Sequence, residues 1–480
     1  MREIARLLLP SIRWDATLGF APVRPAVSRA LAAGVGGFLI EGGSCDAVSA
    51  LAADIRRQAD SAPIIAIAPS TIAAAEWGDP VALPPPGAIA SLRESLVVRR
   101  VAHIVAREAR RAGCNALFAP SCDVAVSASA DMFGTDATLV SAAASEWVDA
   151  AQAEGVLCFA GHFPGAGRII RTAFEMPTVR DSDDSLYATD LVPFRATIDA
   201  GVAGVMIADA RYSALDPSGA PAPLSRPILQ KLLRGQLGFD GLAIADAESL
   251  AVQTGARVAA ADMVAAGIDL VMRPANVDVE LRALMDAVQA GRLDRERVHD
   301  AGSRQRLRAE MASAPSSFLA RSADDHAWLG DVGERAIAVI RGRSVRVASP
   351  IEVAVVGASQ QAGVPSVVAA FAAGIADAGG DGSSVRHVTT PSGVVRSTLV
   401  VVLLPPGTNA STLSHVDARA ISDAAALCAE ARRLGRDTAV VWCGHPAHEL
   451  ALAGASLVVA CWSAVPAMVR AAGRWLVRRV

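Results

Sequence analysis

Short apolar runs alternate with alanine-rich helical stretches from about Ala33 to Asn276, and their spacing constrains the fold more than any other feature. The runs are Val35–Ile40, Ile64–Ala68, Ala116–Ala119, Val156–Ala160, Gly204–Ala208, Leu242–Ala245 and Leu270–Met272, with Leu7–Ile12 as an earlier candidate. Strand–helix units at this spacing are typical of a parallel sheet, and seven or eight of them predict a TIM-type (β/α)8 barrel. The alternative is an open doubly wound sheet, although no GxGxxG motif follows the first run.

The length of 480 residues predicts a second domain, because one core rarely supports so long a chain. A loop-forming stretch, Ser313–Ser317, follows the charged helical stretch Arg295–Met311. We therefore expect a barrel over 1–312, a linker over 313–350 with a helix at Glu334–Arg341, and a smaller α/β sandwich over 351–480. The strands expected in the sandwich are Val353–Val356, Leu399–Leu404, Ala439–Trp442 and Leu457–Ala460, with a helix at Ala418–Leu434.

The charge and the cysteine content indicate which class of molecule the protein binds and in which cellular compartment it is located. A net charge of −3 without a basic run gives no case for nucleic acid, so a carbohydrate or another small molecule is the expected partner. Lys231 is the only lysine and lies in a helical stretch, which argues against Schiff-base chemistry from a barrel strand. Seven scattered cysteines without a CxxC motif, and no apolar run of membrane-spanning length, predict a cytoplasmic protein. The sequence specifies no oligomeric state.

Polar residues follow several of the expected strands, where the chemistry of a parallel barrel is located. They are Glu41, Asp123, His162, Asp209, Asp246 and Arg273. Because the carboxyl ends of the strands meet on one rim, we expect these side chains to line a polar pocket. Asp246 has an alternative role as a helix N-cap, since apolar Leu250 and Val252 follow it.

No metal or cofactor site is expected. His445-Pro446-Ala447-His448-Glu449 matches neither the HExxH nor the HxxEH order, and Pro446 disrupts the helical register that would place both imidazoles on one face. The other histidines are widely dispersed along the chain.

The barrel region resembles glycoside hydrolase family 3 through five motifs in the family's order. These are Gly34-Val35-Gly36-Gly37-Phe38, Gly113-Cys114-Asn115 through Ala119-Pro120-Ser121-Cys122-Asp123-Val124, His162-Phe163-Pro164-Gly165, Leu215-Asp216-Pro217 with Pro221–Ser225, and Leu233–Gly241. The His-Phe-Pro-Gly motif is most similar to that of the two-domain β-N-acetylglucosaminidase branch. The second region resembles the family's C-terminal domain more loosely, through Gly333–Ile337 and Val440–Trp462.

The resemblance implies a retaining glycoside hydrolase that acts on β-linked N-acetylhexosaminides or related glycosides. Asp246 would be the nucleophile that forms the glycosyl-enzyme, and Asp123 and His162 would hold sugar hydroxyls. The resemblance implies no cofactor.

The sequence departs from the family where the chemistry is expected. The family's lysine, second histidine and aspartate around His-Phe-Pro-Gly are Gly161, Ala166 and Arg168 here, and Arg171-Thr172-Ala173 replaces the Asp-His acid/base dyad. Asp209 or Glu449 could replace the missing acid. Arg168, Arg171, Arg211 and Arg273 could together bind an anionic group. The alternative to a hydrolase is a catalytically inactive homologue that serves as a sugar-binding or scaffold protein.

Overall fold

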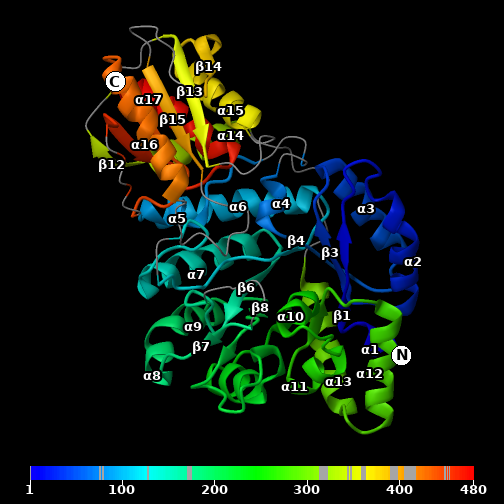
Figure 1. Ribbon diagram of the computed structural model, residues 1–480. Coiled ribbons are helices and arrows are strands. Elements are labelled where there is room, and N and C mark those ends of the chain that lie inside the picture. Colours follow the sequence, from blue (N-terminus) through cyan, green and yellow to red (C-terminus); the bar gives the residue numbers. More distant parts are fainter. Residues whose placement is uncertain are drawn as a thin grey trace. The chain divides into compact units, whose positions relative to one another are not determined.

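The chain folds into two compact units, and each is described by itself (Figure 1). The computed structural model describes residues 2–74, 77, 81–126, 129–169, 176–312, 323–342, 345, 349–357, 364–389, 398–404, 418–447, 450, 452 and 454–479. The first unit comprises Met1–Val81, Val98–Val124 and Asp136–Arg321, and the second comprises Ala82–Val97, Ala125–Thr135 and Ser322–Val480. The boundaries drawn at 312 and 350 from the sequence stay a prediction.

The first unit is built on a parallel sheet that closes on itself. Its strand order is β1-β11-β10-β8-β6-β5-β4-β3-β2. The strands are β1 (Leu8–Leu9), β2 (Ser11–Arg13), β3 (Gly37–Glu41), β4 (Ile64–Ile67), β5 (Ala116–Leu117), β6 (Leu157–Phe163), β8 (Gly204–Ile207), β10 (Leu242–Asp246) and β11 (Leu270–Met272). Only Pro10 separates β1, which pairs with β11, from β2, which pairs with β3. The predicted barrel is therefore confirmed, and the expected runs form its strands.

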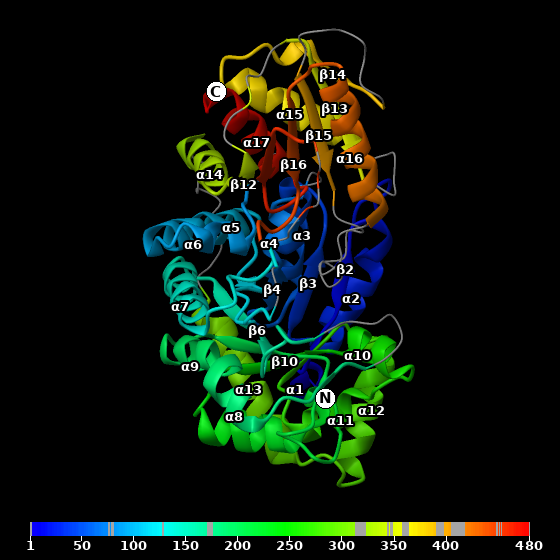
Figure 2. The ribbon, with the colours of Figure 1, turned by 60° about the vertical axis from the view of Figure 1, so that its left-hand side comes forward.

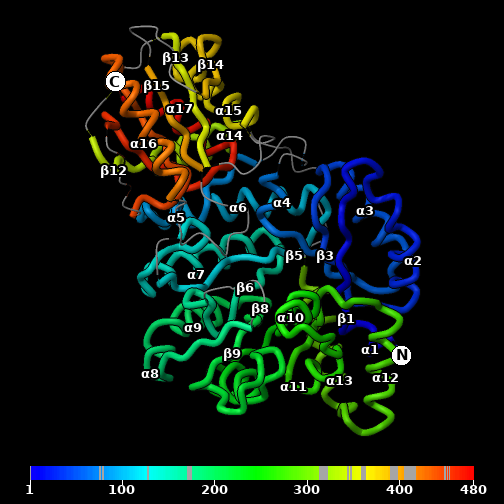
Figure 3. The backbone as a smooth tube through the Cα atoms, in the orientation of Figure 1, coloured from blue at the N-terminus to red at the C-terminus, as the bar shows by residue number. Residues whose placement is uncertain are grey.

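Helices surround this sheet, and several begin where the sequence places a capping side chain. The elements are α1 (Arg2–Ala5), η1 (Ala21–Val23), α2 (Arg24–Ala33), α3 (Cys45–Gln58), α4 (Pro69–Ile72), α6 (Ser95–Arg111), α7 (Ala137–Ala153), α8 (Asp183–Ser185), η3 (Leu186–Asp190), α9 (Val192–Asp199), η4 (Ala222–Leu224), η5 (Pro227–Gln236), α10 (Ala247–Thr254), α11 (Ala260–Ala266), α12 (Val277–Gln289) and α13 (Arg295–Met311), with a short ribbon of β7 (Thr178–Val179) and β9 (Arg211–Tyr212). The side chains of Ser44, Asn276 and Asp294 accept hydrogen bonds from the first turns of α3, α12 and α13. The first helix, α1, packs beside α12 and α13, as the chain trace shows (Figure 3).

Aliphatic side chains on alternate strand positions fill the barrel. Among them are Leu9, Leu39, Ile244 and Met272. Side chains alternate between the two faces of a strand, so a residue two positions after Leu39 or Ile244 lies on the same face of its strand, toward the barrel interior. This alternation aims Glu41 and Asp246 at the carboxyl-end opening of the barrel, which we call the mouth.

A buried aspartate ties the opposite end of the barrel together. Asp269, just before β11, is fully buried and forms ion pairs with Arg234, Arg297 and Arg304. Its Oδ2 also accepts a hydrogen bond from the backbone N–H of Ala243 at 2.9 Å. The carboxylate thus joins η5 and α13 to two neighbouring strands.

The second unit is a parallel sheet with helices on both faces. Its strand order is β12-β17-β16-β15-β13-β14, and only β12, at one edge, runs antiparallel to its neighbour. The elements are β12 (Ala338–Gly342), β13 (Ile351–Val356), β14 (Val385–His387), β15 (Thr398–Leu403), β16 (Thr438–Trp442), β17 (Leu457–Ala460), α5 (Pro86–Ser91), α14 (Ala323–Arg335), α15 (Val364–Asp377), η7 (Gly382–Ser384), α16 (Ala418–Arg433) and α17 (Pro466–Arg478). Helices α15 and α17 pack together on one face, and α16 covers the other (Figure 2).

The helix expected at Glu334–Arg341 is wrong. Helix α14 ends at Arg335, and Ala338–Gly342 form the edge strand β12, which pairs with β17. A partner distant in sequence therefore determines this segment. Within the described residues, no helix is long and apolar enough to cross a bilayer.

We predict that Asp269→Ala lowers the free energy of unfolding by about 3–5 kcal/mol, because three arginines would lose their shared buried counter-ion. Urea unfolding of the variant and the wild type would measure the difference. Glu430→Ala removes the carboxylate of an exposed pair with Arg433 and should leave the midpoint unchanged. A loss below about 1 kcal/mol for Asp269→Ala would contradict this role.

Candidate active site

Three strands bring opposite charges together at the barrel mouth. Arg273, just after β11, binds Asp246 at the end of β10 through Nη1 and Glu41 at the end of β3 through Nη2. The contact between Arg273 Nη2 and Glu41 Oε1 is 2.6 Å. Arg13, at the end of β2, donates from Nε to Glu41 at 3.0 Å and also pairs with Glu248. These five residues form one network, the mouth network.

Asp246 is both the last residue of a strand and the first cap of a helix. Its Oδ1 accepts hydrogen bonds from the backbone N–H groups of Glu248 and Ser249, at 3.0 and 3.1 Å, at the start of α10. Its Oδ2 accepts from Arg273. The helix-cap role considered for Asp246 is therefore observed, and its role as nucleophile stays a prediction. Hydrogen bonds and the ion pair hold both carboxylate oxygens, and 12% of the side chain is exposed.

Arg273 is held in an unfavourable local conformation. Its backbone φ of 49° lies in the left-handed region, which costs a non-glycine residue of order 1–3 kcal/mol. Its Nε atom is buried without a hydrogen-bond partner in the described part of the chain, and lies 3.9 Å from the Glu248 carboxylate. The carboxylates of the mouth network offset these costs, and the backbone N–H of Arg273 also donates a hydrogen bond to the carbonyl oxygen of Leu9 at 3.0 Å.

Burial and charge act in opposite directions on the two central carboxyls. Burial raises the pKa of Asp246 above the ordinary aspartate value, and the charge of Arg273 offsets this only in part. Burial also raises the pKa of Glu41, but the charges and hydrogen bonds of Arg273 and Arg13 outweigh it and leave that pKa below the ordinary value. Glu41 is therefore firmly ionised while Arg273 stays in place.

A pocket of about 580 Å³ opens beside the network. Arg13, Glu248 and Arg273 line it, together with other residues of α10, the segment after α10, the loop after β11, and Glu280 of α12. Asp246 and Glu41 are not among the lining residues. The volume falls within the range of small-molecule sites. Arg273 thus contacts both the pocket and Asp246.

Asp123 and His162 lie together, as expected, but the Asp123 carboxylate mainly accepts hydrogen bonds from backbone N–H groups. The buried Asp123 carboxylate accepts hydrogen bonds from the backbone N–H groups of His162 and Ala166, at 3.1 and 2.6 Å, and contacts His162 Nδ1 at 2.9 Å. Burial raises the pKa of Asp123, but the charge of His162 and these hydrogen bonds outweigh it, so the pKa is lowered overall. Asp123 therefore shapes the His162–Gly165 loop, while His162 keeps 42% of its side chain exposed.

The structure describes only some of the arginines that were predicted to form an anion-binding cluster. Arg168 donates to Asp190 at 2.8 Å, to Asp181 at 2.9 Å and to Ser185 at 3.2 Å, so these side chains occupy its guanidinium. Arg171 and Glu449 lie outside the described residues. Of the arginines predicted to bind an anion, Arg273 is the one that the structure brings to the nucleophile candidate.

Asp209 follows β8 and is 7% exposed. The sheet places it next to the Asp246 strand, because β8 pairs with β10. On the same measure Asp246 is 9% exposed, so burial alone does not separate the two aspartates, and the role of Asp209 as an acid stays a prediction.

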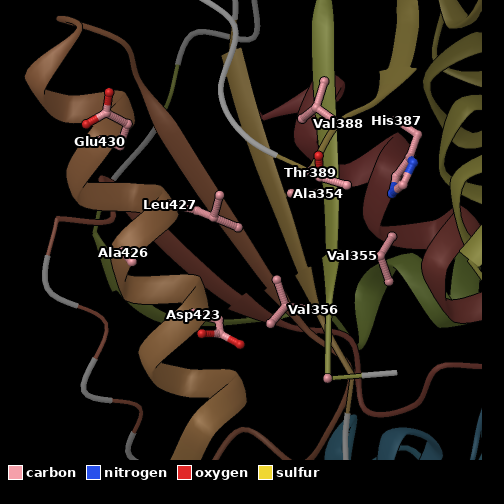
Figure 4. A pocket seen from close by; sticks show the side chains of 11 residues that line it. Ala354, Val355, Val356, His387, Val388, Thr389, Asp423, Ala426, Leu427 and Glu430 are labelled. Atoms are coloured by element: carbon pink, nitrogen blue, oxygen red, sulfur yellow. The ribbon is translucent and has the colours of Figure 1, made fainter. Parts of the chain in front are cut away.

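A second pocket, of about 670 Å³, lies in the second unit at the carboxyl end of β13. Its titratable residues are His387, Asp423 and Glu430. Figure 4 shows both acids on α16 and the histidine on the other side of β13, so the three do not converge on one point. The mouth network is the better candidate for chemistry. No group of three or more potential metal ligands gathers within the described ranges.

Two members of the mouth network, Arg13 and Glu248, were absent from the sequence prediction. The local sequence around each of them nevertheless indicated a position near the carboxyl ends of the strands. Arg13 continues the alternation of Leu9 and Ser11, and Glu248 lies in the first turn after Asp246. Their pairing across 235 residues has no local signature.

Comparisons with known proteins agree with this architecture. A β-N-acetylglucosaminidase/β-glucosidase of Cellulomonas fimi is 32% identical over 229 residues, which are 43% of this chain and 40% of the relative. A β-hexosaminidase of Xanthomonas campestris pv. campestris is 34% identical over 174 residues, covering 35% of this chain and 50% of the relative. The chain therefore spans half or less of the length of these relatives.

A solved structure extends the likeness to the whole fold. The family 3 β-N-acetylglucosaminidase from Paenibacillus sp. str. FPU-7 superposes with a TM-score of 0.81 at 21% identity, covering 100% of this chain and 96% of the other. The model of the glycosyl hydrolase family 3 N-terminal domain matches residues 24–307, more than half of the 480 residues. On that match, the chain belongs to glycoside hydrolase family 3.

Proposed function

We propose that the protein is a retaining glycoside hydrolase that acts on β-linked N-acetylhexosaminides or related glycosides, with Asp246 as the nucleophile. One observation carries the proposal: an aspartate at the carboxyl end of a barrel strand is paired with Arg273, which lines a pocket of suitable size. The substrate class follows from the names of the relatives.

The surroundings of Asp246 suit a nucleophile. Two backbone N–H groups fix its orientation, and Arg273 favours the ionised form against the effect of burial. Asp246 would attack the anomeric carbon to form a glycosyl ester, which water would then hydrolyse. His162 is partly exposed and is proposed to hold a sugar hydroxyl, with Asp123 keeping it in position.

The second candidate is a sugar-binding or scaffold protein without catalysis. The ion pair between Arg273 and Asp246 favours it, because an arginine in contact with the nucleophile competes with the sugar for the same oxygen. The experiment below separates the two candidates. A cytoplasmic location also stays a proposal, supported by seven buried cysteines that form no disulfide.

We predict that a 5-fluoro-N-acetylglucosaminyl fluoride labels Asp246. Fluoride leaves without protonation, so trapping depends on the nucleophile and not on an acid. Intact mass should increase by one fluorosugar, and peptide mapping should place the ester on Asp246.

Asp246→Asn should remain unlabelled, and Glu248→Gln should still react, because it removes a neighbouring charge but keeps the nucleophile. Binding of N-acetylglucosamine in a thermal-shift assay without any adduct would instead support the sugar-binding protein.

A second prediction concerns pH. Since the reaction needs Asp246 ionised and its pKa is raised, kcat/KM for a 2,4-dinitrophenyl β-N-acetylglucosaminide should fall on the acid side at a pH above the ordinary aspartate value of about 3.9. Arg273→Gln removes a charge that lowers this pKa, so the acid limb should move to still higher pH. An acid limb below the ordinary value, or one that Arg273→Gln leaves in place, would argue against Asp246.

A further inference from the structure

Two carboxylates from distant strands meet on one guanidinium at the mouth. Glu41 extends from β3 and Asp246 from β10, and β1, β2 and β11 lie between them in the closed sheet. Each binds a different terminal nitrogen of Arg273. The two carboxyl groups are thus both held by one guanidinium at the mouth.

This spacing has a chemical meaning in a retaining glycosidase. Such enzymes hold their nucleophile and their acid/base carboxyl about 5–5.5 Å apart, on either side of the anomeric carbon. A planar guanidinium with one hydrogen bond on each side spans a comparable gap. Glu41 is also more accessible than Asp209, with 25% of its side chain exposed.

We propose that Glu41 is the acid/base residue of this site. The proposal rests on the proposed function, in which Asp246 is the nucleophile. It supplies the group that Arg171-Thr172-Ala173 lacks in sequence, and it uses the residue at the end of β3, in the second βα unit of the barrel.

Arg273 occupies the place that the anomeric centre would take between the two carboxylates. Like an oxocarbenium-like transition state, its guanidinium is planar, delocalised and positive. A sugar entering from the adjacent pocket has to displace this side chain, and its Nε, which has no hydrogen-bond partner among the described residues, gives up no hydrogen bond when it moves.

Displacement of Arg273 also changes the protonation of Glu41. Without Arg273, Glu41 keeps Arg13 but faces the negative charges of Asp246 and Glu248, and the sugar removes water around it. Both changes favour the protonated form that an acid catalyst needs. Substrate binding would therefore convert a firmly ionised Glu41 into a proton donor.

The steps balance over one turnover. Asp246 Oδ2 attacks the anomeric carbon, the bond to the leaving oxygen breaks, and Glu41 gives its proton to that oxygen. Glu41, now a carboxylate, then takes a proton from water as the water oxygen attacks the same carbon. The ester to Asp246 breaks, and both carboxyls return to their starting states.

Leaving-group dependence tests the proposal. In Glu41→Ala and Glu41→Gln, kcat/KM for a phenyl β-N-acetylglucosaminide should fall about 10²–10⁴-fold, whereas the 2,4-dinitrophenyl glycoside, which needs no acid, should fall less than about tenfold. Azide should accelerate Glu41→Ala and yield the β-glycosyl azide. The alkaline limb of the pH profile of kcat, which reports groups in the enzyme–substrate complex, should disappear.

Glu248→Gln is the matched control, since it removes another carboxylate of the same network. It should change both substrates by one common factor and show no azide product. Equal losses on both substrates in the Glu41 variants, or no azide product, would overturn the role of Glu41. Fluoride trapping keeps the two hypotheses apart: an unlabelled wild type refutes the hydrolase, whereas labelling of Asp246 without leaving-group dependence refutes only Glu41.

Discussion

Closure of the sheet by one N-terminal stretch is the constraint on which the site depends. Leu8–Leu9 pair with β11 and Ser11–Arg13 pair with β3, so eight consecutive strand positions around the barrel have partners on both sides. An open sheet would leave β3 and β11 at distant edges. Closure brings Glu41 and Arg273, which are 232 residues apart, into contact.

The barrel was predictable because its strands are buried on both faces and read as continuous apolar runs. The run at Leu242–Ala245 is such a strand, and the next residue, Asp246, is both its end and the cap of α10. The segment after α14 shows the limit of this reasoning. Its residues were expected to form a helix, but they form β12, because the edge of β17 offers backbone partners that no local pattern encodes.

The residues of the candidate site were predictable by position but not by partner. A strand-end location identified Asp246, Arg273, Asp123 and His162. Which charge faces which depends on barrel closure, and so the links from Arg273 to Glu41 and from Arg13 to Glu248 were missed. The same limit applies to Arg168, whose guanidinium is taken up by Asp190 and Asp181 rather than directed to a ligand.

The division of the chain bears on how the protein can be dissected. The second unit draws on Ala82–Val97 and Ala125–Thr135 as well as on the C-terminal residues from Ser322 onward. Its sheet therefore comes from one end of the polypeptide, while part of its compact body is encoded within the barrel sequence. A truncation between residues 312 and 322 would remove most of the second unit but keep Ala82–Val97 and Ala125–Thr135, which belong to it. The two units are consequently interleaved along the sequence, and neither corresponds to one continuous stretch of the chain.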